Sequence, residues 1–214
     1  MFFQIFYDYM KDGRIIRKGA LSYAGMGVTA VAVVLGLFLY ADGIVRDWAH
    51  SIRSPGFDVV MRGISEAGLG IYEAGVALIF MGAGYLLRSE RTWGIGKKGL
   101  IAVAVSGIGV QFIKHLVGRP RPRLLDSGVH HVGPSIAGGM DSFPSGHTIT
   151  AFALAVVLAK GYPSWKIPIY GLACLIGFSR IYLDSHFASD VFAGAVLGVW
   201  IGWVVSRRKE IRNY

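Results

Sequence analysis

Apolar residues fall in long blocks along this chain, separated by short polar stretches, and they do not repeat at the spacing of an amphipathic helix. A helix that crosses a bilayer needs about 20 mostly apolar residues. The pattern therefore predicts an all-α fold, a six-helix transmembrane bundle over residues 20–206, within a single domain, residues 1–214. The predicted spans are Ala20–Ala41, Gly68–Leu87, Leu100–Val117, His147–Ala159, Ile167–Leu183 and Asp190–Ser206.

The composition excludes an ordinary soluble domain. Of the 214 residues, 53% are hydrophobic and 16% are charged, and the mean hydropathy is +0.50. A soluble domain of this length carries about 25% charged residues. The single cysteine, Cys174, has no partner for an internal disulfide.

Lysine and arginine are unevenly distributed over the segments that connect the spans. Fourteen of the 22 fall in the N-terminal segment, the second and fourth connections and the C-terminal tail. Cytoplasmic loops of membrane proteins carry such an excess. We therefore expect residues 1–19 and 207–214 on the cytoplasmic side, and Lys114, Arg121 and Arg180 at the outer face. Anchoring at the inner leaflet explains the net charge of +9, and no nucleic-acid partner is expected.

The segment before the first span has two features of its own. The basic residues at 11–18 resemble the start of a signal peptide, but the apolar block of 22 residues exceeds the usual length of about 7–15. We expect a retained anchor. Aromatic residues between Phe2 and Tyr9 recur at helical spacing, so residues 1–19 form either an interfacial helix or a frayed terminus.

Small residues on the last predicted span indicate how the bundle packs. Gly194, Gly198 and Gly202 recur every four residues, and small residues let helix backbones approach in a membrane. Asp190 and His186 extend the same helical face. This face is therefore expected to point into the bundle.

Three polar clusters lie at the ends of predicted spans, all at the same membrane face. They are Lys114 with Arg121-Pro122, then Pro144-Ser145-Gly146-His147, and finally Ser179-Arg180 with His186 and Asp190. Ionisable groups at membrane depth are costly and are usually functional. Their residue types are those that phosphate chemistry requires.

Each cluster supplies a different part of a phosphate site. Lys114, Arg121 and Arg180 are cations for the phosphate oxygens, and guanidinium groups bind such oxygens in a bidentate manner. Ser145 offers a hydroxyl. Gly146 permits close approach to a helix N-terminus, which favours an anion.

The histidines and the carboxylate complete the predicted chemistry. His186 has Asp190 one turn away, and this carboxylate is expected to fix the tautomer of an attacking imidazole. His147 is then the group that protonates the leaving oxygen. Each element also has a structural reading, because basic residues often snorkel, Pro-Ser-Gly often forms a turn and cap, and a His–Asp pair is often only a satisfied contact.

The three segments together resemble the signature of the type 2 phosphatidic acid phosphatase superfamily of integral membrane lipid phosphatases. Lys114 is followed after six residues by Arg121-Pro122. Residues 144–147 read Pro-Ser-Gly-His, and Ser179-Arg180 is followed by His186 and Asp190 at the family's spacing. Arg119 and Arg123, in the duplicated sequence RPRPR, are further candidates for phosphate contacts.

The resemblance implies a six-helix bundle with its site at the outer face of a bacterial inner membrane. It implies metal-independent hydrolysis without a cofactor, through a phosphohistidine on His186, with His147 as general acid. Lys114, Arg121, Ser145, Gly146 and Arg180 would hold the phosphate of a lipid substrate. Phosphatidylglycerophosphate, phosphatidate, undecaprenyl diphosphate and lipid A phosphates are the implied substrate classes, and the motifs do not separate them.

Other functions and features stay open at this point. A lipid phosphotransferase would use the same site, whereas a transporter would place charges through the membrane rather than at one face. Glu73, inside the second span, either bonds to another helix or lines a headgroup pocket. His130 and His131 are expected in a glycine-rich loop rather than a metal site. A solvated outer segment that caps the bundle is expected to hold Asp42, Arg46, Asp47, Arg53 and Asp58.

Overall fold

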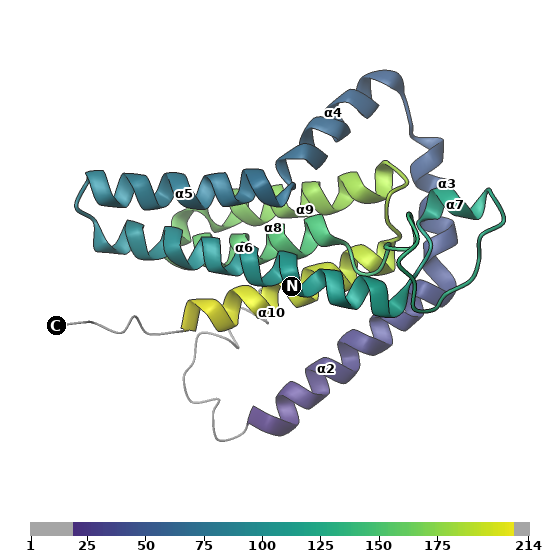
Figure 1. Ribbon diagram of the computed structural model, residues 1–214, viewed down its shortest axis with the longest axis horizontal. Helices are drawn as coiled ribbons and strands as arrows, with labels where there is room; N and C mark the ends of the chain where they lie inside the picture. Colours follow the sequence, from purple (N-terminus) through teal and green to yellow (C-terminus); the bar gives the residue numbers. More distant parts are fainter. Residues whose placement is uncertain (1–18, 208–214) are drawn as a thin grey trace.

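The computed structural model describes residues 19–207, and every regular element in that range is helical (Figure 1). The expectations for residues 1–18 and 208–214 lie outside the described residues. The elements are α2 (Gly19–Gly36), η2 (Leu37–Ala41), α3 (Asp42–Ser51), α4 (Pro55–Ala67), α5 (Gly70–Leu86), α6 (Glu90–Val117), α7 (Pro122–Leu125), α8 (Gly146–Gly161), η3 (Pro163–Trp165), α9 (Lys166–Tyr182) and α10 (Ala188–Arg207).

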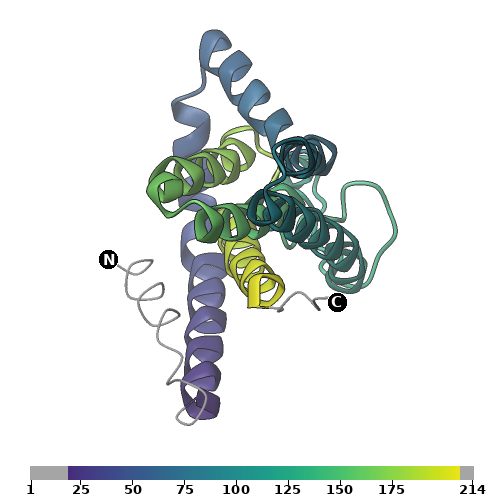
Figure 2. The same cartoon turned by 90° about the vertical axis from the view of Figure 1, so that its left-hand side faces the viewer.

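Helix α8 is the centre of the bundle. Eleven of its sixteen residues are buried, and it packs against α6, α9 and α10. These helices and α5 run along the long axis of the molecule, as Figure 2 shows by looking along the bundle from one end. A short apolar helix suffices here because other helices, rather than lipid, surround it.

The predicted glycine face of α10 packs directly on α8. A Cβ added at Gly198 would lie 2.4 Å from the carbonyl oxygen of Ile149, and one at Gly202 would lie 2.5 Å from that of Ala153. Only glycine permits such close backbone contact. The two helices that carry His147 and Asp190 are therefore held at a fixed separation.

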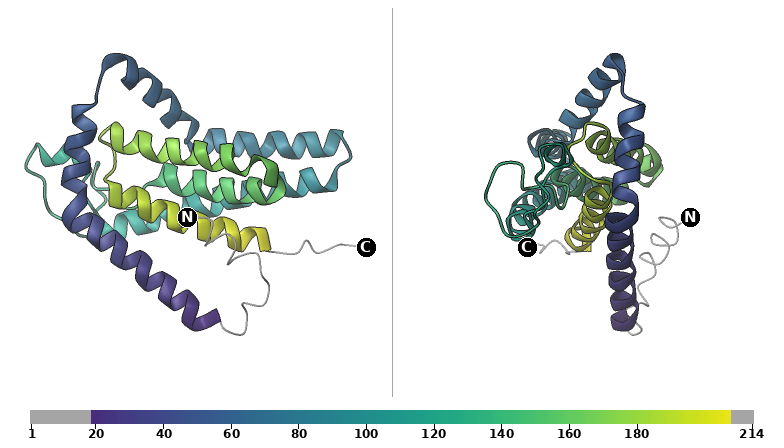
Figure 3. Two further views of the ribbon diagram at one scale, coloured as in Figure 1. Left: turned by 180° about the vertical axis from the view of Figure 1, so that it is seen from behind. Right: turned by 90° about the vertical axis from the view of Figure 1, so that its right-hand side faces the viewer.

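Helices α2 to α4 lie around the outside of this bundle. Seen from behind in Figure 3, α2 slopes away from the bundle and α3 crosses one end of it. Helix α4 then returns towards α5, with a bend of 56° between the two helices. Gly68, at the bend, leaves no room for a side chain, because a Cβ there would lie 2.4 Å from Ile176 Cγ2.

The predicted all-α membrane bundle is confirmed, although the helices differ from the prediction in length and in how many could cross a membrane. A helix occupies each of the six predicted blocks. By length and composition, three helical stretches of the described chain are long enough to cross a membrane, or four if the bent α4–α5 pair forms one span. The segment from Asp42 to Asp58, expected to be a solvated cap on the bundle, forms α3 and the start of α4. Most of its residues are exposed or half-buried, whereas Asp42 is buried.

Helix α6 is also longer than predicted, because it begins at Glu90 rather than Leu100. The added turns contain glycines and lysines, which interrupt the apolar run. Those glycines serve packing on α5: a Cβ at Gly96 would lie 2.5 Å from the backbone nitrogen of Met81. Close contact between helices thus requires glycines, which a prediction from hydropathy alone assigns to a loop.

Candidate active site

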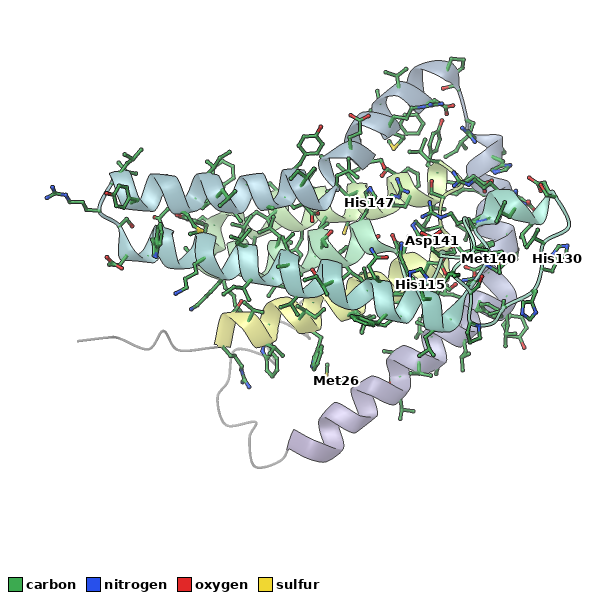
Figure 4. All side chains as sticks on the ribbon, in the orientation of Figure 1. Met26, His115, His130, Met140, Asp141 and His147 are labelled. Carbon is green, nitrogen blue, oxygen red and sulfur yellow. The ribbon has the colours of Figure 1, made fainter. Side chains whose placement is uncertain are left out.

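The three polar clusters meet at one end of the bundle. They lie where α6 ends, where α8 begins and in the turn between α9 and α10. The backbone nitrogen of Ser145 donates to the carbonyl oxygen of Asp190 at 3.1 Å, which joins the second cluster to the third. In Figure 4, His147 and Asp141 lie near this end, while His130 lies at the outer edge of the loop after α7.

A left-handed glycine turns the chain at the end of α6. Gly118 has φ 52°, and its N–H donates to the carbonyl oxygen of Lys114 at 2.8 Å. A Cβ there would lie 1.8 Å from the carbonyl oxygen of Gly133, so no other residue fits. This turn brings Arg121 back beside Lys114.

Lys114 and Arg121 converge on one carboxylate, Asp141. Arg121 donates through Nε and Nη2 to the two oxygens at 2.8 and 2.7 Å, and Lys114 Nζ lies 3.3 Å from Oδ2. The bidentate bond from Arg121 holds the pKa of Asp141 well below its usual range. The two cations thus already bind one planar oxyanion.

The second cluster forms the start of α8. Ser145 is fully buried, and its Oγ accepts a hydrogen bond from Thr148 Oγ1 at 2.9 Å. A Cβ at Gly146 would lie 3.8 Å from Lys114 Nζ, an ordinary van der Waals distance, so the glycine lies beside the cation. Within residues 19–207 the ring of the half-buried His147 makes no hydrogen bond. That ring is available to exchange a proton with a ligand.

Arg180, at the end of α9, is partly satisfied. Its Nη1 donates to Ser65 Oγ on α4, whereas its Nε is buried and has no hydrogen-bond partner in the described chain. A buried guanidinium N–H without a partner is rare and costly. An anion between Arg180 and the other two cations would satisfy it.

His186 is held by a backbone carbonyl rather than by Asp190. Its ring is 2% exposed, and Nδ1 donates to the carbonyl oxygen of Ser142 at 2.7 Å. Asp190 Oδ2 lies 3.7 Å away, beyond hydrogen-bond distance. The expectation that Asp190 directly fixes the tautomer is therefore wrong: Ser142 places the proton on Nδ1 and leaves the Nε2 lone pair free.

Burial also sets the charge of this histidine. It lowers the pKa of His186, although the nearby Asp190 carboxylate acts in the opposite direction and Arg180 and Arg121 assist the lowering. A neutral imidazole is the form that can attack an electrophile. The hydrogen bond to Ser142 thus orients the ring, and burial favours its neutral form.

Asp190 is fixed by a buried network that the sequence did not reveal. Its Oδ1 accepts from Arg119 Nη1 at 2.6 Å, and its Oδ2 accepts from Ser142 Oγ at 2.6 Å and from the Phe187 N–H at 2.8 Å. Arg119 also donates through Nη2 to Asp42 Oδ2 at 2.8 Å. Asp42 is buried at the start of α3.

The two outer arginines of RPRPR, Arg119 and Arg123, lie in different surroundings. Arg119 lies near the rings of Phe38 and Phe187, 4.5 and 4.0 Å from their centroids, and its guanidinium donates to Asp42, Ser189 and Asp190. Arg123 is exposed. The only sequence signals for the network were charges at the boundary of predicted spans, Asp42 among them.

Glu73, His130 and His131, the other polar residues considered in the sequence, are not part of this site. Glu73 is 3% exposed, and neither carboxyl oxygen has a hydrogen-bond partner in the described chain. Asp141 binds cations rather than His130 or His131, and residues 19–207 contain no group of three residues suited to a metal ion.

Comparison with known proteins agrees with this geometry. A lipid A 1-phosphatase from Rhizobium johnstonii is 31% identical over 186 residues, which is 81% of this chain and 75% of the relative. Phosphatidylglycerophosphatase B from Bacillus subtilis is 29% identical over 192 residues, 83% of this chain and 88% of the relative.

A solved structure has the same fold. The crystal structure of a transmembrane PAP2 type phosphatidylglycerolphosphate phosphatase from Bacillus subtilis aligns with a TM-score of 0.67 and 26% identity, over 88% of this chain and 98% of that one. Residues 98–214 match the sequence profile of the PAP2 superfamily, and that range includes all three motifs. The chain is thus an integral membrane protein that belongs to the PAP2 superfamily of phosphatases, as its motifs indicated.

Proposed function

We propose that this protein hydrolyses the phosphate of a membrane lipid phosphate through a covalent phosphohistidine on His186. The observation that carries the proposal is the hydrogen bond between His186 Nδ1 and the Ser142 carbonyl, which leaves Nε2 as a nucleophile beside cationic side chains. The named relatives, phosphatases of lipid A and of phosphatidylglycerophosphate, support lipid phosphate as the substrate class.

The first step transfers the phosphoryl group to the enzyme. Nε2 of His186 attacks phosphorus and forms the N–P bond, while the bond from phosphorus to the lipid oxygen breaks and its electron pair remains on that oxygen. His147 gives this oxygen a proton, which yields the lipid alcohol, or a lipid monophosphate from a diphosphate. Ser142 and the Asp190 network stabilise the charged imidazole.

The second step returns the enzyme to its starting state. His147, now neutral, removes a proton from water, and the water oxygen attacks phosphorus. The N–P bond breaks with its electrons returning to Nε2, and inorganic phosphate leaves. Lys114, Arg121 and Arg180 bind the non-bridging oxygens in both steps, together with N–H groups around Ser145 and Gly146.

The proposal is tested by phosphate release from purified protein in detergent. Phosphatidylglycerophosphate, phosphatidate, undecaprenyl diphosphate and a lipid A phosphate form the panel, with a water-soluble phosphate ester for comparison. The lipids are expected to be much better substrates, since their tails position the headgroup. Transfer of phosphate to another lipid, without release into water, would instead support a phosphotransferase.

Activity is expected to survive an excess of EDTA. Three fixed cations and a helix N-terminus neutralise the phosphate, so the mechanism does not assign a step to Mg²⁺. The measurement is phosphate release before and after chelation and dialysis. Loss of activity that added Mg²⁺ restores would contradict the proposed electrostatics.

We further propose that the site faces the outer side of a bacterial inner membrane, with both termini in the cytoplasm. The distribution of lysine and arginine supports this orientation. Ser127 follows α7 at the site end, Ser164 lies in η3 at the opposite end, and both are exposed. In a Cys174→Ala background, an impermeant thiol reagent should label Ser127→Cys in intact cells and Ser164→Cys only after lysis. The reverse pattern would invert the proposed topology.

A further inference from the structure

A polar cavity lies at the end of the bundle opposite to the catalytic motifs. It has a volume of about 400 Å³ and lies where α6 begins and where α8 and α10 end. Its lining includes Arg91, Lys98, Lys160, Glu90, Ile95 and Val157. Lys114 lies 23 residues beyond Arg91 on α6, which corresponds to about 35 Å along a helix with 1.5 Å rise per residue. The cavity is therefore separate from the proposed active site.

The cavity carries an excess of positive charge. Three cations line it against one carboxylate, and the charge of Arg207 acts on Lys160 from the end of α10. No ion pair joins Lys98 or Lys160 to another residue in the described part of the chain. Lysines that serve only to orient a membrane protein do not need to line a cavity. Lys98 and Lys160 do line one, together with the apolar side chains of Ile95 and Val157.

One of the cations is held in a fixed orientation. Arg91 Nη2 donates to the carbonyl oxygen of Gly161, and its guanidinium lies over the ring of Tyr162, 5.6 Å from the centroid. Its other N–H groups have no partner within residues 19–207. A guanidinium fixed in this way is prepared to bind phosphate oxygens.

Aromatic residues place the cavity at the depth of lipid headgroups. Trp93 at the start of α6 and Trp165 in η3 both lie at this end of the bundle. Trp203 carries Arg207 over its ring at 3.9 Å. Tryptophan is enriched at the boundary between hydrocarbon and headgroups. A ligand in this cavity thus meets headgroups before bulk water.

We propose that this cavity binds the phosphodiester headgroup of an anionic phospholipid from the leaflet opposite to the active site. The phosphate would lie between Lys98 and Lys160 with Arg91 at its edge, and the glycerol and upper acyl chain would contact Ile95 and Val157. Basic pockets between membrane helices recognise anionic headgroups in this manner. A bound lipid would join α6, α8 and α10 and stabilise the bundle.

Phosphatidylglycerol is the probe, since a phosphodiester offers no terminal phosphate for hydrolysis. Intact protein in detergent is expected to retain phosphatidylglycerol in native mass spectrometry and to melt at least about 4 °C higher with it than with phosphatidylcholine. In Lys98→Gln and Lys160→Gln the retained lipid and the thermal shift should both fall several-fold. Lys98→Arg should keep both.

Lys97→Gln is the matched control. Lys97 is the neighbour of Lys98 on α6, is exposed and does not line the cavity. Equal losses in Lys97→Gln and Lys98→Gln would mean diffuse surface attraction and would overturn the proposal. Full lipid retention in Lys98→Gln and Lys160→Gln would overturn it as well. So would a shift with inorganic phosphate that Lys98→Gln and Lys160→Gln abolish, because the site would then recognise a free anion rather than a lipid.

Discussion

Replacing His186 with alanine is expected to abolish turnover and any covalent phosphoenzyme. His186 is the only protein nucleophile in the proposed mechanism, and its ring is buried and bonded to Ser142. The measurement is incubation with ³²P-labelled lipid phosphate, followed by an alkaline quench, since phosphohistidine is labile in acid. Wild-type protein should carry label and the variant none.

Two of the other histidines, His147 and His130, provide a graded comparison. His147→Ala should still form some phosphoenzyme but should turn over about 10²–10⁴ times more slowly, as is typical when a general acid is lost. His130→Ala, at the outer edge of its loop, should retain activity. Substantial turnover by His186→Ala would eliminate the covalent mechanism, and an inactive His130→Ala would revive the metal interpretation of that loop.

Replacing Arg119 with alanine is expected to destabilise the fold by about 3–5 kcal/mol, the usual penalty when one partner of a buried ion pair is removed. Arg119 is 5% exposed and bridges two buried carboxylates, Asp42 and Asp190. Without it both carboxylates remain buried without their counter-charge. Unfolding in detergent, followed by circular dichroism or thermal melting, measures the loss.

Arg123→Ala is the control for this prediction. Arg123 belongs to the same RPRPR segment but is exposed, so its replacement should change stability by no more than about 0.5 kcal/mol. Arg119→Lys should fall between the two, because a lysine keeps the charge but cannot bridge both carboxylates in the same geometry. If Arg119→Ala melted like Arg123→Ala, the buried network would have no stabilising role.

Much of the site could be predicted because short motifs encode it. Pro144 to His147 stand at a helix start, which anchors their positions relative to one another. Lys114 and Arg180 come at the ends of apolar blocks, and hydropathy locates such ends well. Because the three motifs lie at the same end of the predicted spans, their polar side chains could be expected to form one site.

The contacts that orient His186 could not be predicted for two physical reasons. The acceptor of its Nδ1 proton is the backbone carbonyl of Ser142, and every residue carries such a group, so composition gives no signal. Asp42 and Arg119 are 77 positions apart, and only the crossing of α3 over the end of the bundle brings them together. Long-range pairing of this kind depends on packing rather than on periodicity.

Asp141 affects how phosphate enters and leaves the proposed site. It holds both oxygens on Arg121 and one near Lys114, in the arrangement that a phosphate would need. Because its pKa is far below the usual range, it stays ionised at any physiological pH. In the proposed mechanism an entering phosphate would therefore replace an internal carboxylate, which would weaken ground-state binding. After the reaction the same carboxylate would bind the cations again. Asp141 would thus compete with inorganic phosphate for Lys114 and Arg121 and favour release of the product.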